Sequence, residues 1–290
     1  MKAESRNAII LAAGTSSRFV PLSQEIPKGL LEVKGEILIE RQIRQLKEAG
    51  IDDICIVVGY KAEKFVYLKD KFGIELVIND DFDRYNNISS IIRVLDRLGN
   101  TFICSSDNYF PENVFLDSET ETYYSALYAT GSTQEYCIQS DEHDYITSVK
   151  IGGSDSWYMV GHVYFSAEFS KVFLNILAKE YINEETRHQY WEDVYIRHID
   201  TLPFMKIHRY SPHQIEEFDS LEDLRKFDSS YIEDTRSSII KEIASRLNCS
   251  ESDLSDFQKI PDSPSKAMFS FMRSGKKYYM DLSDNSIRQA

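Results

Sequence analysis

Residues 8–28 read AIILAAGTSSRFVPLSQEIPK, and the fold of the chain is interpreted outward from this stretch. Its first residues are apolar and partly β-branched, which is typical of a short buried strand. Small residues follow at 13–17, where the backbone can approach a ligand closely and leave amide N–H groups free to bind it. Arg18 lies in this loop and Lys28 closes it after Pro27, so two cations stand near those amides. The stretch predicts a site for the phosphates of a nucleoside triphosphate.

Two common phosphate-binding motifs do not match the sequence. A Walker motif needs Gly-Lys-Ser/Thr at the end of the loop, and no such triplet occurs. The dinucleotide fingerprint needs three glycines, and only Gly14 is present here. The remaining alternative is that this strand and loop resemble a phosphate site by chance. The number of residues that fit such a site argues against chance.

Length and composition indicate a soluble globular protein. The 290 residues are 42% hydrophobic and 28% charged, enough for a large core. The formal net charge of −14 argues against nucleic acid or an anionic membrane as the main partner. An anionic nucleotide can still bind, because surface charges are screened beyond about 8 Å at physiological ionic strength. Near the ligand, the two cations and a divalent metal would set the sign of the potential.

Cysteine usage and hydropathy predict a cytoplasmic location. The four cysteines form no C-x-x-C pair, and three of them (Cys55, Cys104 and Cys137) fall in apolar runs. They predict buried free thiols in a reducing compartment. The apolar segment 8–13 is too short to span a membrane, and it lacks the features of a signal peptide.

Alternating strands and helices predict an α/β fold with a Rossmann-like, mostly parallel sheet flanked by helices. A period-two pattern after residue 122 adds an antiparallel strand region over the crevice. The expected strands are 8–12, 54–58, 74–78, 101–104, 123–130, 135–139, 145–151, 157–166 and 205–210. The expected helices are 37–49, 61–72, 88–98, 167–181, 187–199 and 220–227.

Composition shifts near Ser229, so we expect a large N-terminal domain at 1–230 and a small C-terminal α+β domain at 231–290. The second segment holds nine basic and nine acidic residues and is formally neutral. A helix is expected at 231–247, followed by a hairpin of strands 268–273 and 276–282. The hairpin resembles the first one of choline-kinase-like proteins, which suggests a fused partner domain beyond residue 290.

The motif that begins at Leu11 resembles the signature of the nucleotidyltransferases that activate sugar phosphates and phosphocholine. That signature is LAAG-x-x-x-R followed by PK, here residues 11–14, Arg18 and Pro27-Lys28. Many members carry a second glycine where this chain has Ser16. The resemblance extends from residue 8 to about 227 and is strongest to the CTP:phosphocholine cytidylyltransferase branch, which includes 2-aminoethylphosphonate cytidylyltransferases. It implies transfer of CMP from CTP to a small amine-bearing phosphate or phosphonate, with release of pyrophosphate.

Such a reaction needs alignment and charge neutralisation rather than a general base, because the attacking oxygen is already anionic. The resemblance assigns Arg18 and Lys28 as catalytic charge stabilisers. Asp107 follows the predicted strand 101–104 and matches the family's aspartate, so it is the first candidate ligand for Mg²⁺. The alternative is an Asx-turn residue after a strand.

A second metal ligand is expected in Tyr190-Trp191-Glu192-Asp193, which resembles the YWD segment of the same branch. Position matching selects Glu192, with Asp193 as the alternative, because neighbouring residues of a helix do not share a face. An exposed acidic helix face would give the same pattern.

The resemblance also implies contacts to the substrates. Nucleotide contacts are expected from the first strand and loop and from a segment like Y-N-N-x-x-S: Leu11, Ala12, Ala13, Gly14, Thr15, Ser16, Tyr85, Asn87, Ser90 and Ser106. An aromatic box could hold a cationic amine. The acceptor candidates are Tyr136, Lys150, His162, Tyr190 and Trp191. Core aromatics, a buried histidine and a surface lysine are the competing interpretations.

The choice of acceptor and two other classes of protein stay open as alternatives. Phosphocholine and 2-aminoethylphosphonate are both possible acceptors, since the residues do not choose between a quaternary and a primary amine. A sugar-1-phosphate nucleotidylyltransferase is a second possibility, and a non-catalytic nucleotide-binding member of the fold is a third.

Overall fold

The computed structural model describes residues 5–116, 120–260 and 267–290. The chain forms two compact units, each made of two separate stretches of sequence. Unit 1 contains Met1–Gly14 and Ile39–Glu216, and unit 2 contains Thr15–Leu38 and Glu217–Ala290. The small-residue loop therefore passes from one unit to the other after Gly14, and the predicted boundary at residue 230 falls within unit 2. Each unit is described by itself.

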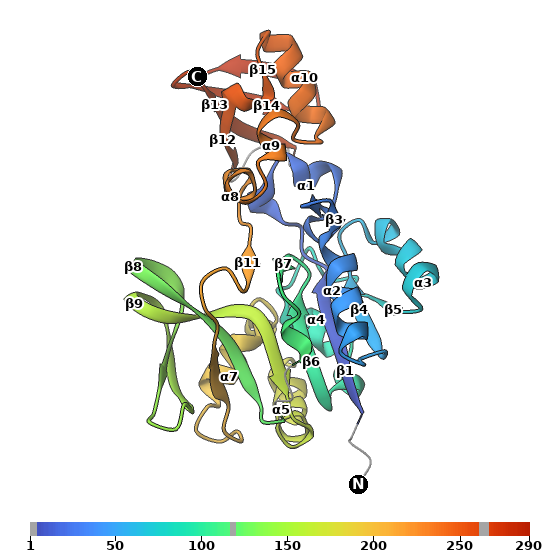
Figure 1. Cartoon of the computed structure of the whole chain (residues 1–290), viewed down its shortest axis with the longest axis vertical. Coiled ribbons are helices and arrows are strands. Elements are labelled where there is room, and N and C mark those ends of the chain that lie inside the picture. The colour runs from blue at the N-terminus through green and yellow to red at the C-terminus, as the bar shows by residue number, and fades with distance from the viewer. Residues whose placement is uncertain (1–4, 117–119, 261–266) are drawn as a thin grey trace. The chain divides into compact units, whose positions relative to one another are not determined.

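Unit 1 is built on a seven-stranded sheet with β1 near its centre (Figure 1). In spatial order the strands are β10 (Lys206–Arg209), β8 (Tyr123–Ser140), β9 (Ile146–Phe165), β6 (Asn100–Ser105), β1 (Arg6–Ala12), β4 (Ile54–Val58) and β5 (Glu75–Ile78). β1 pairs in parallel with both β4 and β6, so that Ile9 lies beside Cys55 on one side and Ile103 on the other. β9 pairs antiparallel with β6 and with β8. This arrangement confirms the predicted mostly parallel sheet with an antiparallel region.

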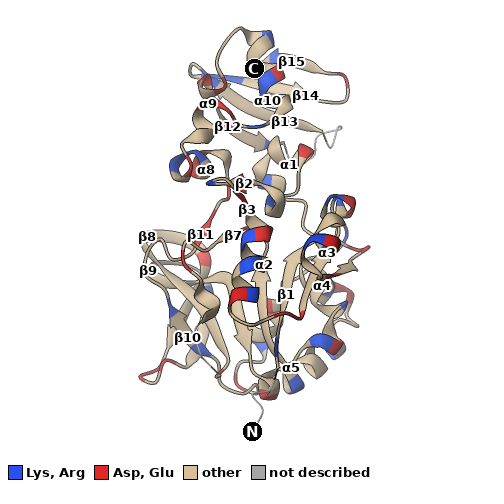
Figure 2. Cartoon of the chain, turned by 45° about the vertical axis from the view of Figure 1, so that its right-hand side comes forward, with Lys and Arg blue, Asp and Glu red and all other residues tan. Residues whose placement is uncertain are grey.

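The α-helices of unit 1 accompany this sheet. They are α2 (Leu38–Glu48), α3 (Tyr67–Phe72), α4 (Ile88–Ile92), α5 (Ala167–Glu180), α6 (Glu184–Arg187) and α7 (Trp191–Arg197). In α2, Ile39, Ile43 and Leu46 recur at helical spacing and are fully buried. Its outer surface carries both acidic and basic side chains (Figure 2). The chain leaves this helix at Gly50, whose φ of +76° is the left-handed conformation that favours glycine.

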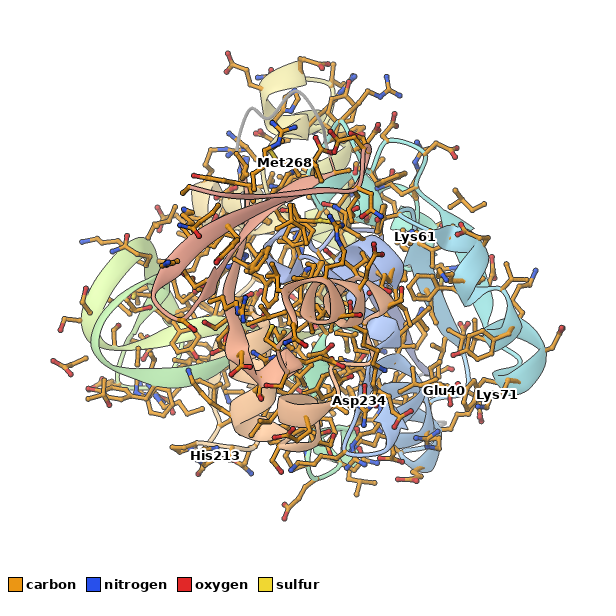
Figure 3. The ribbon with its side chains drawn as sticks, turned by 90° about the horizontal axis from the view of Figure 1, so that it is seen from above. Glu40, Lys61, Lys71, His213, Asp234 and Met268 are labelled. Carbon is orange, nitrogen blue, oxygen red and sulfur yellow. The ribbon has the colours of Figure 1, made fainter. Side chains whose placement is uncertain are left out.

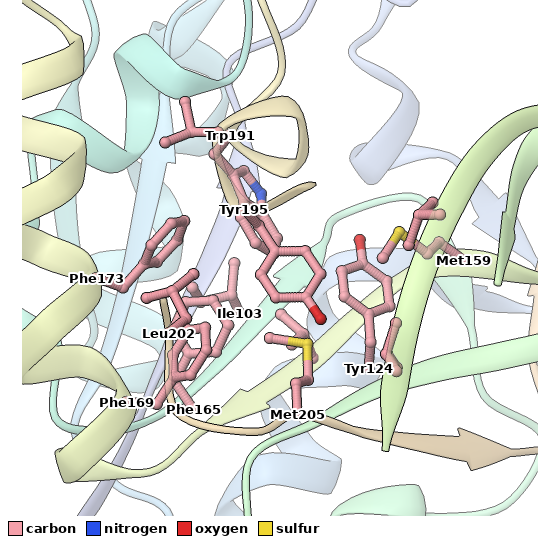
Figure 4. Packing of buried hydrophobic residues seen from close by; sticks show 14 of the residues in the cluster. Ile103, Tyr124, Met159, Phe165, Phe169, Phe173, Trp191, Tyr195, Leu202 and Met205 are labelled. Carbon is pink, nitrogen blue, oxygen red and sulfur yellow. The ribbon is translucent and has the colours of Figure 1, made fainter. Parts of the chain in front are cut away.

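A buried hydrophobic cluster of unit 1 joins β9 to α5 and α7 (Figure 4). Phe165 of β9 stacks edge-to-face against Trp191, with ring centroids 5.4 Å apart. Phe173 of α5 contacts the same indole at 6.0 Å. Burial of three such side chains fixes where α7 begins, and α7 carries the acidic pair Glu192 and Asp193.

Four short antiparallel strands were expected between residues 123 and 166, and the structure has two long ones instead. β8 and β9 run through the positions where breaks were expected, with shifts of register between paired residues. Gly131 and Gly152 adopt φ of +78° and +80°, so the turn-like residues form bulges without ending the pairing.

Four predicted helices are shorter or divided. In the segment 61–72 the α-helix begins only at Tyr67, after a 3-10 turn at Ala62–Phe65. In the segment 88–98 the α-helix ends at Ile92, Val94 leaves the helical region with φ of −131°, and a 3-10 turn follows at Leu95–Arg97. The segment 187–199 divides at Tyr190, which is extended and precedes α7. The segment 231–247 divides into α9 (Ser230–Glu233) and α10 (Ser238–Leu247), because Ser237 caps a new helix by accepting the Ile240 N–H.

Unit 2 joins an early and a late part of the chain. Its elements are α1 (Leu22–Glu25), β2 (Glu32–Val33), β3 (Glu36–Ile37), α8 (Leu221–Phe227), α9, α10, β12 (Leu254–Lys259), β13 (Met268–Arg273), β14 (Lys276–Asp281) and β15 (Ser286–Gln289). The Tyr231 hydroxyl donates to the Glu32 carbonyl at 2.8 Å, and the Ser238 N–H donates to the Glu25 carboxylate at 2.8 Å. These bonds connect residues about 200 positions apart, which sequence patterns do not reveal.

The C-terminal sheet of unit 2 is antiparallel, in the order β12-β13-β14-β15. The predicted hairpin corresponds to β13 and β14, and β12 and β15 were not predicted. In β12, Asp256 adopts φ of +51° where the register shifts, which hides the alternation of apolar and polar residues. Across the described parts of the chain, every helix is too short or too polar to cross a membrane.

Candidate active site

A small cavity of about 20 Å³ lies at the carboxyl ends of β1 and β6, within unit 1. Ligands commonly bind at this edge of an open α/β sheet. The cavity is lined by Leu11, Asn87, Ile103, Cys104, Ser105, Tyr124, Gly161, Val163, Trp191 and Glu192. Four of these were candidate site residues from the sequence: Leu11, Asn87, Trp191 and Glu192.

Glu192 carries the negative charge of this cavity. Its Oε1 accepts a hydrogen bond from the Tyr124 hydroxyl at 3.0 Å, and its Oε2 accepts one from Asn87 Nδ2 at 3.2 Å. Burial raises the pKa of the carboxyl group to about 7, although both hydrogen bonds favour its ionised form. Among the described residues, no lysine or arginine forms an ion pair with Glu192. The Glu192 carboxylate can therefore bind a cation that comes from outside the chain.

Asn87 ties the start of α4 to the start of α7. Its Oδ1 accepts the Trp191 N–H at 2.9 Å while its Nδ2 donates to Glu192. Its neighbour Ser90 is buried and accepts a hydrogen bond from Asn79 Nδ2 at 3.0 Å. Asn79 was not predicted as a site residue, because one polar residue after a strand resembles an ordinary turn. Asn87 thus supports the position of Glu192, and Ser90 connects the α4 segment to Asn79.

Tyr85 lies in the same polar segment and faces α6. Its hydroxyl donates to Glu184 at 2.9 Å and lies 3.4 Å from Arg187, whose guanidinium stacks 5.6 Å from the ring centre. The Asn86 N–H adds a bond to the Arg187 carbonyl at 3.0 Å. These contacts hold the segment that precedes α4.

Asp107 lies two residues beyond the end of β6, as expected from the sequence, and it is half-buried. Ser106, before it, is buried, and its N–H donates to the Leu11 carbonyl at 3.1 Å. β7 (Asn108–Tyr109) follows directly. The turn that carries Asp107 is thereby attached to the end of β1.

Asp193 is engaged in local structure. One of its oxygens accepts the Tyr136 hydroxyl and the other accepts the Tyr190 N–H, both at 2.9 Å. The Tyr136 and Tyr190 rings meet edge-to-face with centroids 6.3 Å apart. Burial and the neighbouring Asp193 raise the pKa of the Tyr136 hydroxyl, so the phenol stays protonated. Two predicted acceptor residues and one carboxylate thus form a connected group, which we call the tyrosine–aspartate cluster (Tyr136, Tyr190, Asp193).

Three other acceptor candidates have different surroundings. Trp191 is a core side chain that also reaches the cavity wall. His162 is fully buried between aromatic rings, and burial lowers its pKa to about 3. Lys150 is exposed on β9. His162 thus lies in the core of unit 1 and Lys150 on its surface, and their proposed contacts with the acceptor stay predictions.

The two predicted catalytic cations belong to unit 2, where they share one carboxylate. Arg18 Nη1 lies 2.9 Å from Asp219 Oδ2, and Lys28 Nζ lies 3.8 Å from Asp219 Oδ1. The Arg18 side chain is 75% exposed and that of Lys28 only 8%. The sequence had not identified Asp219 as a site residue, because an acid just before a helix has the pattern of a cap.

The loop itself divides between the units. Ala12 and Ala13 are buried, and the Ala13 carbonyl accepts the Tyr60 N–H at 3.0 Å. Gly14 and Thr15 are exposed. Ser16 adopts φ of +49°, the left-handed conformation that glycine tolerates best, at the position where many family members carry glycine.

No cluster of three or more metal-binding side chains occurs among the residues that the structure describes. Mg²⁺ usually takes one or two carboxylates and completes its shell with substrate phosphates and water. Asp107 and Glu192 provide oxygen ligands only, and Glu192 has no cationic partner in the described chain. This donor set fits Mg²⁺ that arrives with a nucleotide.

Comparisons with known proteins identify the family of the chain. A family model described as "MobA-like NTP transferase domain" matches residues 8–135. The chain is 38% identical over 236 residues to the 2-aminoethylphosphonate cytidylyltransferase of Lancefieldella rimae, covering 79% of this chain and 95% of that protein. It is 33% identical over 221 residues to the choline-phosphate cytidylyltransferase of Streptococcus pneumoniae, covering 76% and 96%. The solved structure of the CTP:phosphocholine cytidylyltransferase from S. pneumoniae superposes with a TM-score of 0.75 at 32% identity, covering 78% of this chain and 99% of that one.

The sheet topology and the matched domain define the class as nucleotidyltransferases. Within that class, the chain belongs to the family that contains the 2-aminoethylphosphonate and choline-phosphate cytidylyltransferases. The resemblance drawn from the sequence is therefore confirmed.

Proposed function

We propose that the protein transfers CMP from CTP to a small amine-bearing phosphonate, with 2-aminoethylphosphonate as the preferred acceptor. The tyrosine–aspartate cluster carries this choice. A primary ammonium can donate hydrogen bonds to a carboxylate and to phenol oxygens. A trimethylammonium group has no donor and depends on aromatic faces alone. The similarity to the L. rimae enzyme supports the same acceptor.

In the proposed reaction, a phosphonate oxygen forms a bond to the α-phosphorus of CTP. The bond from that phosphorus to the oxygen bridging it to the β-phosphate breaks, and pyrophosphate leaves with the electron pair. No proton transfer is needed at the attacking oxygen, so the chain contributes alignment and charge. Arg18 and Lys28 contact the triphosphate and neutralise the charge that gathers on the leaving group.

Asp107 and Glu192 are the proposed ligands of Mg²⁺, which when bound neutralises phosphate charge and orients the phosphates. The bonds from Asn87 and Tyr124 fix the direction of the Glu192 carboxylate before substrate binds. Asn87 is also the proposed contact for cytosine, since an amide offers both a donor and an acceptor.

Acceptor choice can be tested with Asp193→Asn. The amide keeps an oxygen for the hydrogen bonds of the cluster but removes the negative charge. We expect kcat/KM for 2-aminoethylphosphonate to fall about 10- to 100-fold, as for loss of a charged hydrogen bond. The value for phosphocholine should change much less. The matched control is Asp200→Asn, an exposed acid just beyond α7. Equal losses for both acceptors would remove the proposed role of Asp193.

The nucleotide and the reaction class are tested by pyrophosphate release with CTP, UTP or dTTP against 2-aminoethylphosphonate, phosphocholine and glucose 1-phosphate. Release of pyrophosphate only when CTP is combined with one of the two amine compounds supports the proposal. Turnover with the sugar phosphate would assign the protein to the sugar-1-phosphate enzymes. Nucleotide binding without any release would favour a non-catalytic member of the fold.

A further inference from the structure

We infer that Gln42 of α2 is a positioning residue that sets the direction of the Asp107 carboxylate. The inference rests on the proposed role of Asp107 as a metal ligand. Gln42 Nε2 donates to the Ser105 carbonyl at 2.7 Å and to the Asn108 carbonyl at 3.0 Å. These two carbonyls stand on either side of Ser106 and Asp107. One side-chain amide therefore holds both ends of the turn that presents the carboxylate.

The carbonyl oxygen of the Gln42 amide, Oε1, takes no part in holding the turn. Gln42 is 1% exposed, and its Oε1 has no hydrogen-bond partner among the described residues. A buried polar atom without a partner costs about 1–3 kcal/mol. An apolar side chain of similar length would avoid that cost, so the glutamine contributes through its donor group.

The helix that carries Gln42 is itself held in place by its neighbours. Two residues earlier on α2, Glu40 is buried and accepts hydrogen bonds from the Tyr67 hydroxyl at 2.8 Å and from Lys71 Nζ at 2.7 Å, both on α3. Figure 3 labels Glu40 and Lys71 of this group. Ile39 and Ile43 are fully buried on either side. With the helix held in this way, the position of the amide is determined by the core of unit 1.

The same helix provides a matched control, Gln45. Its Nε2 donates to the Phe110 carbonyl at 2.9 Å, beyond the Asp107 turn, and its Oε1 is likewise without a partner in the described chain. Arg41 holds the same carbonyl at 3.0 Å, so the Phe110 segment keeps one bond when Gln45 is changed. The two glutamines differ mainly in whether their bonds enclose Asp107.

Some residues hold a metal ligand in place without touching the metal. Removing such a residue typically lowers metal affinity or activity 10- to 100-fold. Gln42→Met keeps the length of the side chain and removes the donor. The two carbonyls then lose a common partner, and the turn can rotate the Asp107 carboxylate away from the metal. Gln45→Met removes an equivalent donor without touching this turn.

The test is the dissociation constant of Mn²⁺, measured by electron paramagnetic resonance with CTP present and without acceptor. For Gln42→Met we expect this constant to rise 10- to 100-fold, and for Gln45→Met to stay within about threefold of the wild type. Urea unfolding of both variants compares their stability. Equal Mn²⁺ constants in the two folded variants would overturn the inference. If the methionine variants do not fold, Gln42→Asn and Gln45→Asn withdraw each amide by one methylene and give the same comparison.

A third variant separates this inference from the proposed function. Asp107→Asn should weaken Mn²⁺ binding at least as strongly as Gln42→Met. If Asp107→Asn leaves the constant unchanged, Asp107 is not a metal ligand and the proposed function loses that residue. If Asp107→Asn weakens binding and Gln42→Met does not, only the role of Gln42 is refuted.

Discussion

His162, a predicted acceptor contact, is packed among aromatic rings in the core of unit 1. Its imidazole is stacked on Phe102 with a centroid separation of 5.8 Å and an angle of 3° between the rings. The Tyr123 hydroxyl lies 3.3 Å from its Nε2, and the Cys104 sulfur lies 3.6 Å from its Nδ1. Burial, with a smaller effect of His208, lowers the pKa of His162 to about 3. The ring is therefore neutral throughout the physiological range.

This burial predicts a loss of stability in acid. Unfolded His162 takes up a proton near pH 6.5, whereas the folded residue does so only near its pKa of about 3. As the pH falls below 6.5, the unfolded state therefore binds more protons, and His162 lowers the unfolding free energy by up to about 1.4 kcal/mol per pH unit. His162→Phe should remove that part of the slope in urea unfolding measured from pH 7 to pH 4. An unchanged slope in this variant would contradict the assignment.

Lys28 is the opposite case, a nearly buried charge with a proposed catalytic role. Its ammonium lies 5.8 Å from the centre of the Phe19 ring and 3.8 Å from Asp219. Lys28→Ala should reduce kcat by about 10²- to 10³-fold, as for the loss of one group that stabilises transition-state charge. Lys64→Ala, at an exposed position before α3, is the control. Turnover near the wild-type rate in Lys28→Ala would rule out the proposed mechanism.

At the scale of the elements, β9 packs closely against Ser105, the last residue of β6, at Gly161. A Cβ at this position would lie 2.2 Å from Ser105 Oγ, 2.7 Å from Ser105 Cβ and 3.1 Å from Asn108 Oδ1. The glycine is therefore needed where the wall of the cavity meets the Asp107 turn.

Gly161→Ala should lower the unfolding free energy by about 1–3 kcal/mol, because the strands must separate to admit the methyl group. Gly99→Ala is the control, since a Cβ there meets no atom within 4 Å. The comparison is made by urea unfolding. Equal effects of the two substitutions would show that the contact at Ser105 relaxes without cost.

Elements with a regular apolar period could be predicted from the sequence, and buried polar connections could not. β1, β4 and α2 follow from local patterns, and so does the position of Asp107 after β6. Gln42 and Asn79 were missed because a buried amide and an exposed one look the same in a sequence. β8 and β9 were divided in the prediction because glycines signal turns locally, whereas long-range pairing converts them into bulges.

At the scale of the whole molecule, the chain combines a net charge of −14 with a proposed anionic substrate. The two are compatible, because Arg18 and Lys28 attract the phosphates over a few ångströms, whereas the repulsion from distant carboxylates is screened by salt. The relatives match about four-fifths of the chain, and the match extends over nearly their whole length. The cytidylyltransferase reaction is thus the central claim for the matched part.

Phosphorus NMR of the protein with CTP, 2-aminoethylphosphonate and Mg²⁺ tests this claim most directly, because it identifies the bond that forms. The account predicts that the phosphonate resonance is replaced by a coupled phosphonate–phosphate pair, together with an equal amount of pyrophosphate. Unchanged CTP and phosphonate resonances, or CMP and pyrophosphate formed without the mixed anhydride, would contradict it.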